Sequence, residues 1–132
     1  MALKLSLKPH EKVIIGGTVI TNGASASQLI IENKVPILRE RDILTEAKAD
    51  TPCRRIYLVI QLMYIDEQRS TELHPLYWEL VRDLLQAVPS AKGLIEQASQ
   101  FILDGNYYGA LKVTKKLIEY EKELLRNVSK SG

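Results

Sequence analysis

The sequence predicts an α+β protein, in which a small antiparallel N-terminal β-sheet is followed by a C-terminal bundle of about four helices. The main observation is a change of period along the chain. Up to about residue 45, apolar residues alternate with polar ones or form short β-branched runs, whereas after residue 52 they recur with helical spacing. The polar segment between these parts is a linker candidate, so we expect a β-rich lobe over residues 1–48 and a helical lobe over residues 49–132.

The N-terminal lobe is predicted to contain five short strands. Leucines alternate with lysine and serine over residues 3–8, which places the leucines on one strand face and the polar groups on the other. The Asn22-Gly23 dipeptide tolerates positive φ at both positions and predicts a hairpin turn. Pro36 cannot donate to a strand ladder, so the last strand is expected at an edge or to start late. The other strands are expected over residues 13–15, 18–21, 28–32 and 35–39.

The helical lobe begins with a segment whose sequence fits either a buried helix or a buried strand. Residues 53–65 contain an apolar run at 56–60 that is also typical of a buried strand. The length of the segment favours a buried helix, with Thr51 as N-cap and Pro52 at the first helical position.

Three further helices are expected after that segment. The second helix is predicted to begin near Pro75, because apolar residues recur from there at helical spacing. In the last helix apolar pairs recur every seven residues, which is typical of a helix packed nearly parallel or antiparallel to a neighbour. These helices are expected over about residues 75–88, 91–103 and 107–126.

The composition is that of a globular protein. Hydrophobic residues make up 45% of the 132 residues and charged residues 26%, and the net charge of +2 neither requires nor excludes a nucleic-acid partner. The single cysteine, Cys53, cannot form an internal disulfide, which favours a reducing compartment. The N-terminus lacks the apolar run of a signal peptide, and the longest apolar stretch, 56–65, is too short to cross a bilayer. We therefore expect a cytoplasmic protein with no membrane contact.

Catalytic and metal-binding constellations are missing from the sequence. His10 and His74 lie in different lobes, and neither has a potential ligand at metal spacing. Arg54 and Arg55 beside Cys53 would lower a thiol pKa near a helix N-terminus, but an ordinary cysteine at the start of a helix is the better interpretation. We therefore expect a binding protein with no cofactor, not an enzyme.

Two surfaces are candidates for binding a partner. The first is the polar side of the predicted sheet, where basic and hydroxyl side chains can contact phosphates and base edges, although charge that merely faces water is the simpler interpretation. The second is the last helix, whose lysines interleave with glutamates and fit a solvated face better than a nucleic-acid groove. The candidate residues on the sheet are Lys4, Ser6, Lys8, Arg39 and Arg41.

Adjacent aromatic residues in the second helix suggest a further contact. Tyr77 and Trp78 cannot both face the leucine stripe of that helix, so one of them is expected on the surface. An exposed aromatic side chain at this place would mark a protein-binding spot.

Three segments together resemble the flagellar biosynthesis repressor family FlbT. They are the stretch 3–17 with its Glu11-x-x-x-x-Gly16 spacing, the stretch 35–40, and the stretch 54–64, which contains Gln61-Leu62-Met63-Tyr64. The resemblance covers nearly the whole chain. It implies a post-transcriptional regulator that binds the 5′ untranslated leader of flagellin messenger RNA and limits its translation or lifetime. It also implies a small partner, the flagellin-synthesis regulator FlaF.

The first forty-odd residues are also similar to the carbon-storage regulator CsrA, a small β-rich RNA binder. That similarity implies an RNA surface built from the first strand and an arginine near the last one, here Lys4, Ser6, Lys8 and Arg39 or Arg41. Chains of that family form strand-exchanged dimers, which leaves a homodimer open here. The chain departs from the pattern where it has Leu7 in place of a basic residue and a shorter middle hairpin.

Two functions follow from these observations. The first is an RNA-binding repressor of flagellin synthesis, which rests mostly on the resemblance. The alternative is a protein-interaction adaptor or chaperone-like module, whose helical lobe holds flagellin or the co-regulator FlaF while the sheet acts as a scaffold.

Overall fold

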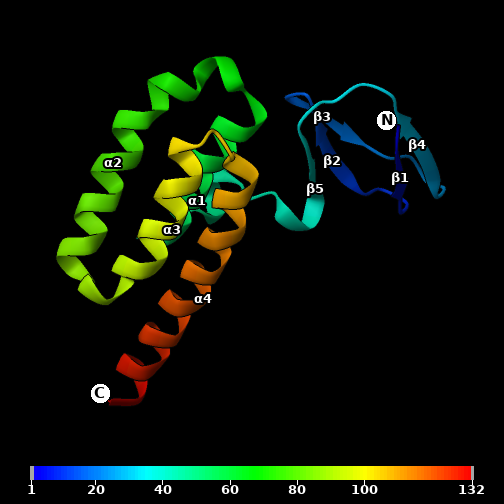
Figure 1. Cartoon of the computed structure of the whole chain (residues 1–132). Helices are drawn as coiled ribbons and strands as arrows, with labels where there is room; N and C mark the ends of the chain where they lie inside the picture. Colours follow the sequence, from blue (N-terminus) through cyan, green and yellow to red (C-terminus); the bar gives the residue numbers. More distant parts are fainter. Residues whose placement is uncertain (1, 132) are drawn as a thin grey trace. The chain divides into compact units, whose positions relative to one another are not determined.

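The computed structural model describes the backbone of residues 2–131 and the side chains of residues 2–128, and it confirms the α+β fold class (Figure 1). Five strands come first and four α-helices follow, with short 3₁₀ helices in the connections. The chain divides into two compact units, Met1–Ile43 and Leu44–Gly132. Leu44 is tied into the second unit, because its N–H donates to Gln61 Oε1 at 2.8 Å and its carbonyl accepts from Gln61 Nε2 at 2.9 Å.

The strands of the first unit form two small antiparallel sheets. One has two strands in the order β1-β4, and the other has three in the order β3-β2-β5. Because β5 pairs only with β2, it lies at a sheet edge, as Pro36 predicted. The strand bounds are β1 Leu3–Leu7, β2 Lys12–Ile15, β3 Thr18–Thr21, β4 Ser27–Ile31 and β5 Ile37–Arg39.

The alternation along β1 sets which side chains are buried. Leu5 and Leu7 are buried with Val13 of β2 in the core of this unit. The intervening side chains point the other way, so Lys4 and Ser6 are exposed on the opposite face. The predicted face of polar residues on the first strand is therefore confirmed.

The hairpin prediction at Asn22-Gly23 is wrong. The hairpin turn is Gly16-Gly17, which joins β2 to β3, and both glycines have positive φ, at 57° and 84°. A turn of two residues with positive φ suits glycine because it has no Cβ. Asn22 instead uses its side chain, whose Nδ2 donates to the carbonyls of Lys8 at 2.7 Å and Ser25 at 3.0 Å. This amide bridges the turn after β1 to the segment before β4.

The second unit opens with helix α1, Pro52–Ile65, so the helical interpretation of this ambiguous segment is confirmed. Thr51 is the N-cap, and its side chain accepts from the N–H of Arg54 at 3.2 Å. The apolar run that also fitted a strand lies on a helix here, because Ile56, Ile60 and Met63 all reach the core of a helical bundle.

Helix α2, Ser70–Ala87, begins before the predicted start at Pro75. Pro75 lies inside the helix, where its missing N–H leaves only the carbonyl of Thr71 without its helical partner. Thr71 is exposed, so water can hydrate that carbonyl. The hydroxyl of Ser70 donates to the carbonyl of Glu67 at 2.7 Å and secures the earlier start.

Helices α3, Lys92–Leu103, and α4, Tyr107–Ser131, complete the bundle. The seven-residue repeat predicted the packing of α4, which contacts both α1 and α3 and buries Ala110, Leu111 and Leu117. Over residues 2–131, every helix is too short or too polar to cross a bilayer.

Candidate functional site

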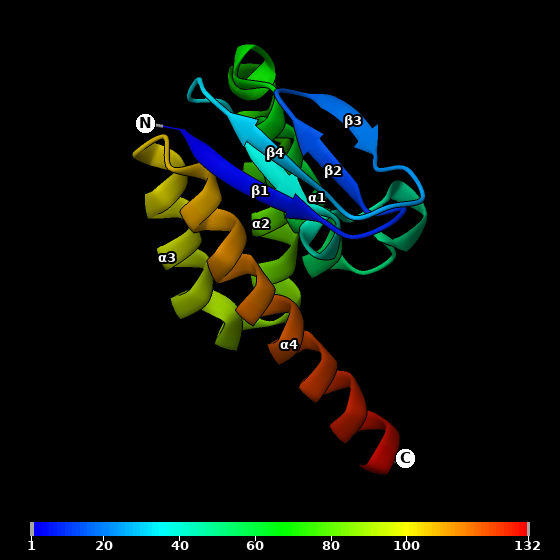
Figure 2. The ribbon, with the colours of Figure 1, turned by 90° about the vertical axis from the view of Figure 1, so that its right-hand side faces the viewer.

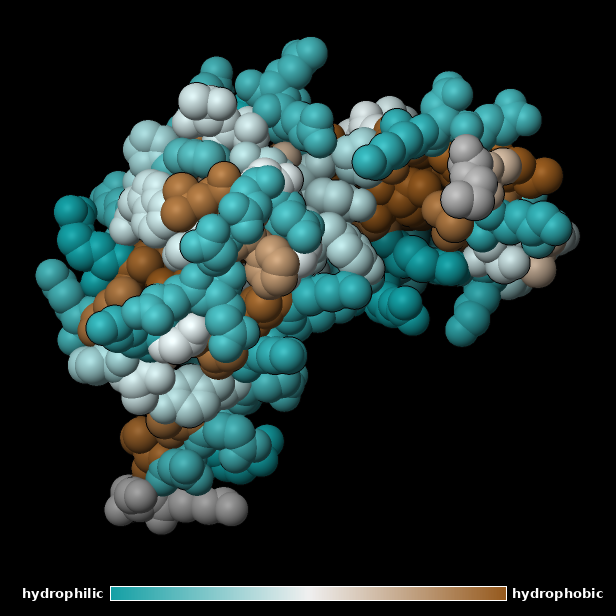
Figure 3. Space-filling view, in the orientation of Figure 1, coloured by the Kyte–Doolittle hydropathy of each residue, from teal (hydrophilic) through white to brown (hydrophobic). Residues whose placement is uncertain are grey.

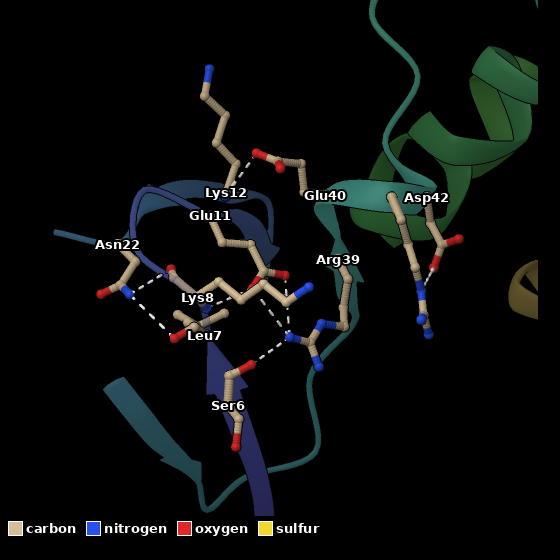
Figure 4. A network of polar contacts seen from close by, with 10 residues as sticks. Ser6, Leu7, Lys8, Glu11, Lys12, Asn22, Arg39, Glu40 and Asp42 are labelled. Atoms are coloured by element: carbon tan, nitrogen blue, oxygen red, sulfur yellow. Dashed lines mark hydrogen bonds and ion pairs between the residues drawn. The ribbon is translucent and has the colours of Figure 1, made fainter. Parts of the chain in front are cut away.

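The five predicted site residues lie in the first unit, at one end of β1 and around the end of β5. Lys4, Ser6 and Lys8 are exposed along one side of the β1 segment. Arg39 ends β5, and Arg41 lies in the short 3₁₀ helix Glu40–Asp42 that follows. The structure brings Lys8, Arg39 and Arg41 to one hollow, whereas Lys4 lies near the start of β1. It places Arg39 against Ser6 (Figure 4).

The hollow is formed by two short segments of chain and has a volume of about 690 Å³. One segment is the turn between β1 and β2, where His10 has the left-handed φ of 62° and its N–H donates to the carbonyl of Gly23 at 2.9 Å. The other is the end of β5 with the turn after it. The lining residues are Lys8, Pro9, His10, Glu11, Arg39, Glu40 and Arg41.

Arg39 connects the two sheets of the first unit. Its Nη2 donates to the carbonyl oxygen of Ser6 on β1 and to Glu11 Oε2, the latter at 3.1 Å (Figure 4). Only this nitrogen of Arg39 makes hydrogen bonds within the described part of the chain, and 34% of the side chain is exposed. The remaining guanidinium donors are therefore available to a ligand, while the group itself is held in place.

Glu11 is a site residue that the candidate surface did not include. The N–H of Lys8 donates to Glu11 Oε1 at 2.9 Å, and this bond together with the nearby Arg39 lowers the pKa of the Glu11 carboxyl. A carboxylate three residues after Lys8, across the Pro9-His10 turn, is the local signal for the first contact. No local signal predicts Arg39, which is 28 positions away.

The free charges around the hollow are mainly basic. Arg39 neutralises Glu11, and Glu40 Oε1 accepts from the backbone N–H of Lys12 at 3.0 Å. Arg41 is largely exposed, and among the described residues it forms a single ion pair, a long one of 3.9 Å with Asp42. Lys8 and Arg41 thus add exposed cationic groups to the hollow that the held Arg39 also lines, and such a set of groups can contact phosphate oxygens.

The reactive groups considered from the sequence do not come together. Cys53 is buried, and burial together with the nearby Glu121 raises its thiol pKa to about 12, the opposite of an activated thiolate. Across residues 2–131 no three histidine, cysteine or acidic side chains are placed to hold a metal ion. His74 Nε2 instead shares a hydrogen bond with the hydroxyl of Tyr107 at 3.2 Å.

Outside the sheet, the sequence also suggested the adjacent aromatics of α2 and the basic side chains of α4 as contact surfaces. Tyr77 is buried and hydrogen-bonds Ser99 at 2.9 Å, whereas Trp78 is exposed, so one of the adjacent aromatics does face away from the core. The basic side chains of α4 alternate with acids. Two ion pairs of this kind are Lys122–Glu119 at 3.2 Å and Arg126–Glu123 at 3.0 Å.

The chain matches the family model described as flagellar protein FlbT over residues 3–125. It is 51% identical over 125 residues to the probable flagellum biosynthesis repressor protein FlbT 1 of Bradyrhizobium diazoefficiens, and the match covers 94% of this chain and 85% of that relative. A probable flagellum biosynthesis repressor protein FlbT of Rhodopseudomonas palustris is 44% identical over 125 residues, with 95% of this chain and 98% of the relative covered.

The flagellum biosynthesis repressor protein FlbT of Caulobacter vibrioides is 37% identical over 131 residues, and the match covers 98% of this chain and 93% of that protein. No solved structure matches the chain. The similarity of the N-terminal strands to the carbon-storage regulator CsrA therefore stays a prediction. The family model and these relatives agree over almost the full length, so the chain belongs to the FlbT family of flagellar proteins.

Proposed function

We propose that this protein represses flagellin synthesis after transcription, by binding the 5′ untranslated leader of flagellin messenger RNA through its N-terminal unit. The observation that carries the proposal is the hollow that the exposed Lys8 and Arg41 line together with the held guanidinium of Arg39. The protein acts in the cytoplasm by occupying the leader, without a catalytic step or a cofactor. Its relatives named as flagellum biosynthesis repressors support the regulatory part of the proposal.

The exposed face of β1 and β4 offers further groups that suit a single strand of RNA. Lys4 and Ser6 lie opposite Ile30 and Gln28 of β4, so a basic group, a hydroxyl, an amide and an exposed apolar side chain share one face. Lysine binds the RNA backbone, while the hydroxyl and amide can hydrogen-bond base edges. Glu11 holds Arg39 before RNA arrives, which reduces the entropy lost on binding.

The test is a titration of the full-length protein with a flagellin leader RNA, against a scrambled RNA, at several salt concentrations. Arg41→Ala removes an exposed group and should weaken leader binding by about 1–3 kcal/mol if it reads a base. Lys4→Ala and Lys8→Ala should weaken both RNAs and flatten the salt dependence, because each removes a phosphate contact. Arg39→Ala is less informative, since it also removes the bond to Ser6.

Arg82→Ala is the matched control, because Arg82 is exposed on α2 and its loss changes the net charge equally. Leader binding that is insensitive to all the sheet variants would reject the proposed surface. If Lys116→Ala then weakens binding, the RNA site lies on α4. A parent protein that does not distinguish the leader from the scrambled RNA would reject the function itself.

A second candidate function is an adaptor that holds flagellin or the co-regulator FlaF on the helical unit. The exposed Trp78 favours it, because a large aromatic on the surface is typical of a protein contact. Trp78→Ala in the full-length chain should then reduce capture of one of these proteins without changing RNA binding. Leu76→Ala, an exposed apolar change two positions earlier, is the control. Capture of neither protein by the parent chain would remove this candidate.

A further inference from the structure

An apolar groove lies at the end of the helical bundle where α1 begins and α2 ends. It has a volume of about 400 Å³. The start of α1 forms its end, α2 forms one wall, and α4 forms the other. The apolar side chains of the two walls are Leu80, Leu84, Val88, Leu117, Leu124 and Leu125.

Helix α4 continues past this groove. At 1.5 Å per residue its 25 residues span roughly 37 Å, whereas the 12 residues of α3 span only about 18 Å. Figures 1 and 2 both show α4 running beyond the ends of α2 and α3. Two side chains secure it where the bundle ends. The hydroxyl of Tyr120 shares a 2.5 Å hydrogen bond with Ser90, and Glu121 accepts from the Thr51 hydroxyl at 2.5 Å.

The segment of α4 beyond the bundle carries apolar side chains that are exposed to solvent. We call residues 119–128 the α4 extension. Leu124 lies seven positions after the buried Leu117 and so continues the packed stripe of α4. Leu125 is 56% exposed and Val128 is 69% exposed. Hydrophobic surface is visible over this end of α4 in Figure 3. A stripe of this kind is typical of a helix that another helix covers.

The charges of the α4 extension indicate which partner helix, and in which orientation, can pack against it. Before Leu124 the three carboxylates of Glu119, Glu121 and Glu123 outnumber the single basic Lys122, whereas Arg126 is the only charged residue from 124 to 128. The extension is therefore acidic at its start and basic towards its end. A second copy in parallel orientation would set Glu123 against Glu123. A second copy in antiparallel orientation sets the acidic part of each helix against Arg126 of the other.

The groove adds a negative charge, which is opposite to the charge of Arg126. Asp83 lies on its α2 wall, is exposed, and makes no ion pair with any described residue. In the antiparallel arrangement the end of the second α4, with Arg126, passes the groove of the first. Asp50, Asp83 and Glu121 outnumber Arg55 around the groove, so its net acidic rim and the basic helix end attract each other.

We propose that two copies of this chain associate through their α4 extensions, antiparallel about a two-fold axis near Leu124 and Leu125. Each extension lays Leu125 and Val128 over the groove of the other copy. The contact is self-complementary, so one patch serves both copies and the assembly closes as a dimer. The inference rests on the helical unit alone and does not depend on RNA binding.

The first experiment measures the mass of the full-length chain by sedimentation over a range of concentrations. The parent protein should be a dimer, and Leu125→Glu should raise the dimer dissociation constant by about tenfold or more, because it places a carboxylate in the apolar seam. Leu103→Glu is the control, since Leu103 on α3 is 66% exposed and lies outside the groove and the extension. Circular dichroism verifies that both variants stay helical.

The second experiment tests the antiparallel pairing by mixing two charge variants. Glu123→Lys and Arg126→Glu should each weaken self-association, because each sets like charges opposite one another. A mixture of the two should form a heterodimer more readily than either forms a homodimer. The ion pair within one helix, Arg126–Glu123, cannot produce that result, since each variant breaks it separately.

A parent protein that is monomeric at every concentration overturns the proposal. So does a dimer that Leu125→Glu leaves intact, or a mixture that shows no preference for the heterodimer. A monomeric parent whose binding to an added amphipathic helical peptide is lost in Leu125→Glu would assign the groove to another protein, and would also reject a second copy as its occupant.

Discussion

The two units of this protein are held together in different ways. Tyr77, Ile60 and Met63 are among the large, fully buried side chains of the helical unit. The buried core cluster of the sheet unit consists of Leu5, Leu7 and Val13 with partly buried neighbours, and Ile14 and Leu38 are its other buried apolar side chains. So small a unit buries little apolar surface. Its sheets and turns are joined by polar side chains that bond backbone groups across the chain. Residues that suit ligand binding by type therefore also stabilise the fold there.

The largest expected effect tests the apolar core of the helical unit. Ile60→Ala should lower the free energy of unfolding of the helical unit by about 2–5 kcal/mol, because Ile60 is fully buried and its removal leaves a cavity. Denaturant unfolding followed by far-UV circular dichroism measures the change. Leu103→Ala, at an exposed position of α3, should stay within about 0.5 kcal/mol of the parent. An equal loss in both variants would contradict an apolar core at Ile60.

A smaller effect tests the polar contacts that join the turns of the sheet unit. Asn22→Ala should lower the stability of the sheet unit by about 0.5–1.5 kcal/mol, because it removes the Nδ2 donor from the carbonyls of Lys8 and Ser25, which water can then hydrate. Hydrogen exchange should then speed up at the amides of β1 and β4 and stay unchanged in α1. Asn33→Ala, exposed after β4, is the control. Unchanged exchange in β1 would show that the Asn22 bridge does not stabilise the unit.

The smallest effect concerns pH and the bond between the two sheets. The N–H of Lys8 and the guanidinium of Arg39 lower the pKa of the Glu11 carboxyl in the folded protein. A lowered pKa adds stability above the ordinary glutamate range, and this stability is lost as the pH falls through the folded value. Glu11→Gln should therefore be less stable than the parent at neutral pH, and the difference should shrink in acid.

Denaturation of both proteins across the acid range measures this difference, with exchange at β1 and β2 reporting on the sheet unit. Glu72→Gln is the control, because the ion pair of Glu72 with Arg69 is long, at 3.9 Å, and exposed. A difference between Glu11→Gln and the parent that grows as the pH falls would have the wrong sign, and would contradict a charged Glu11 as the stabilising form.

Local patterns in the sequence determined the fold class and most of the elements. The alternating leucines of β1, the Thr51-Pro52 start of α1 and the seven-residue repeat of α4 each depend on residues close together in the chain. For the same reason the exposed polar residues on β1 were predictable, since a strand that buries Leu5 and Leu7 must turn Lys4 and Ser6 outward.

Only the tertiary structure decided which polar residues meet. Glu11 and Arg39 are 28 positions apart, and Cys53 donates its N–H to Glu121 across 68 positions. Asn22 fits a hairpin turn by type, yet its side chain bonds the carbonyl of Lys8 instead. No local rule covers these pairs, because the free energy of a buried or bridging polar group depends on the partner that the fold brings to it. The sequence therefore named the basic side chains of the candidate site, and the tertiary contacts with Ser6 and Glu11 determined that Arg39 is held there while Arg41 stays exposed.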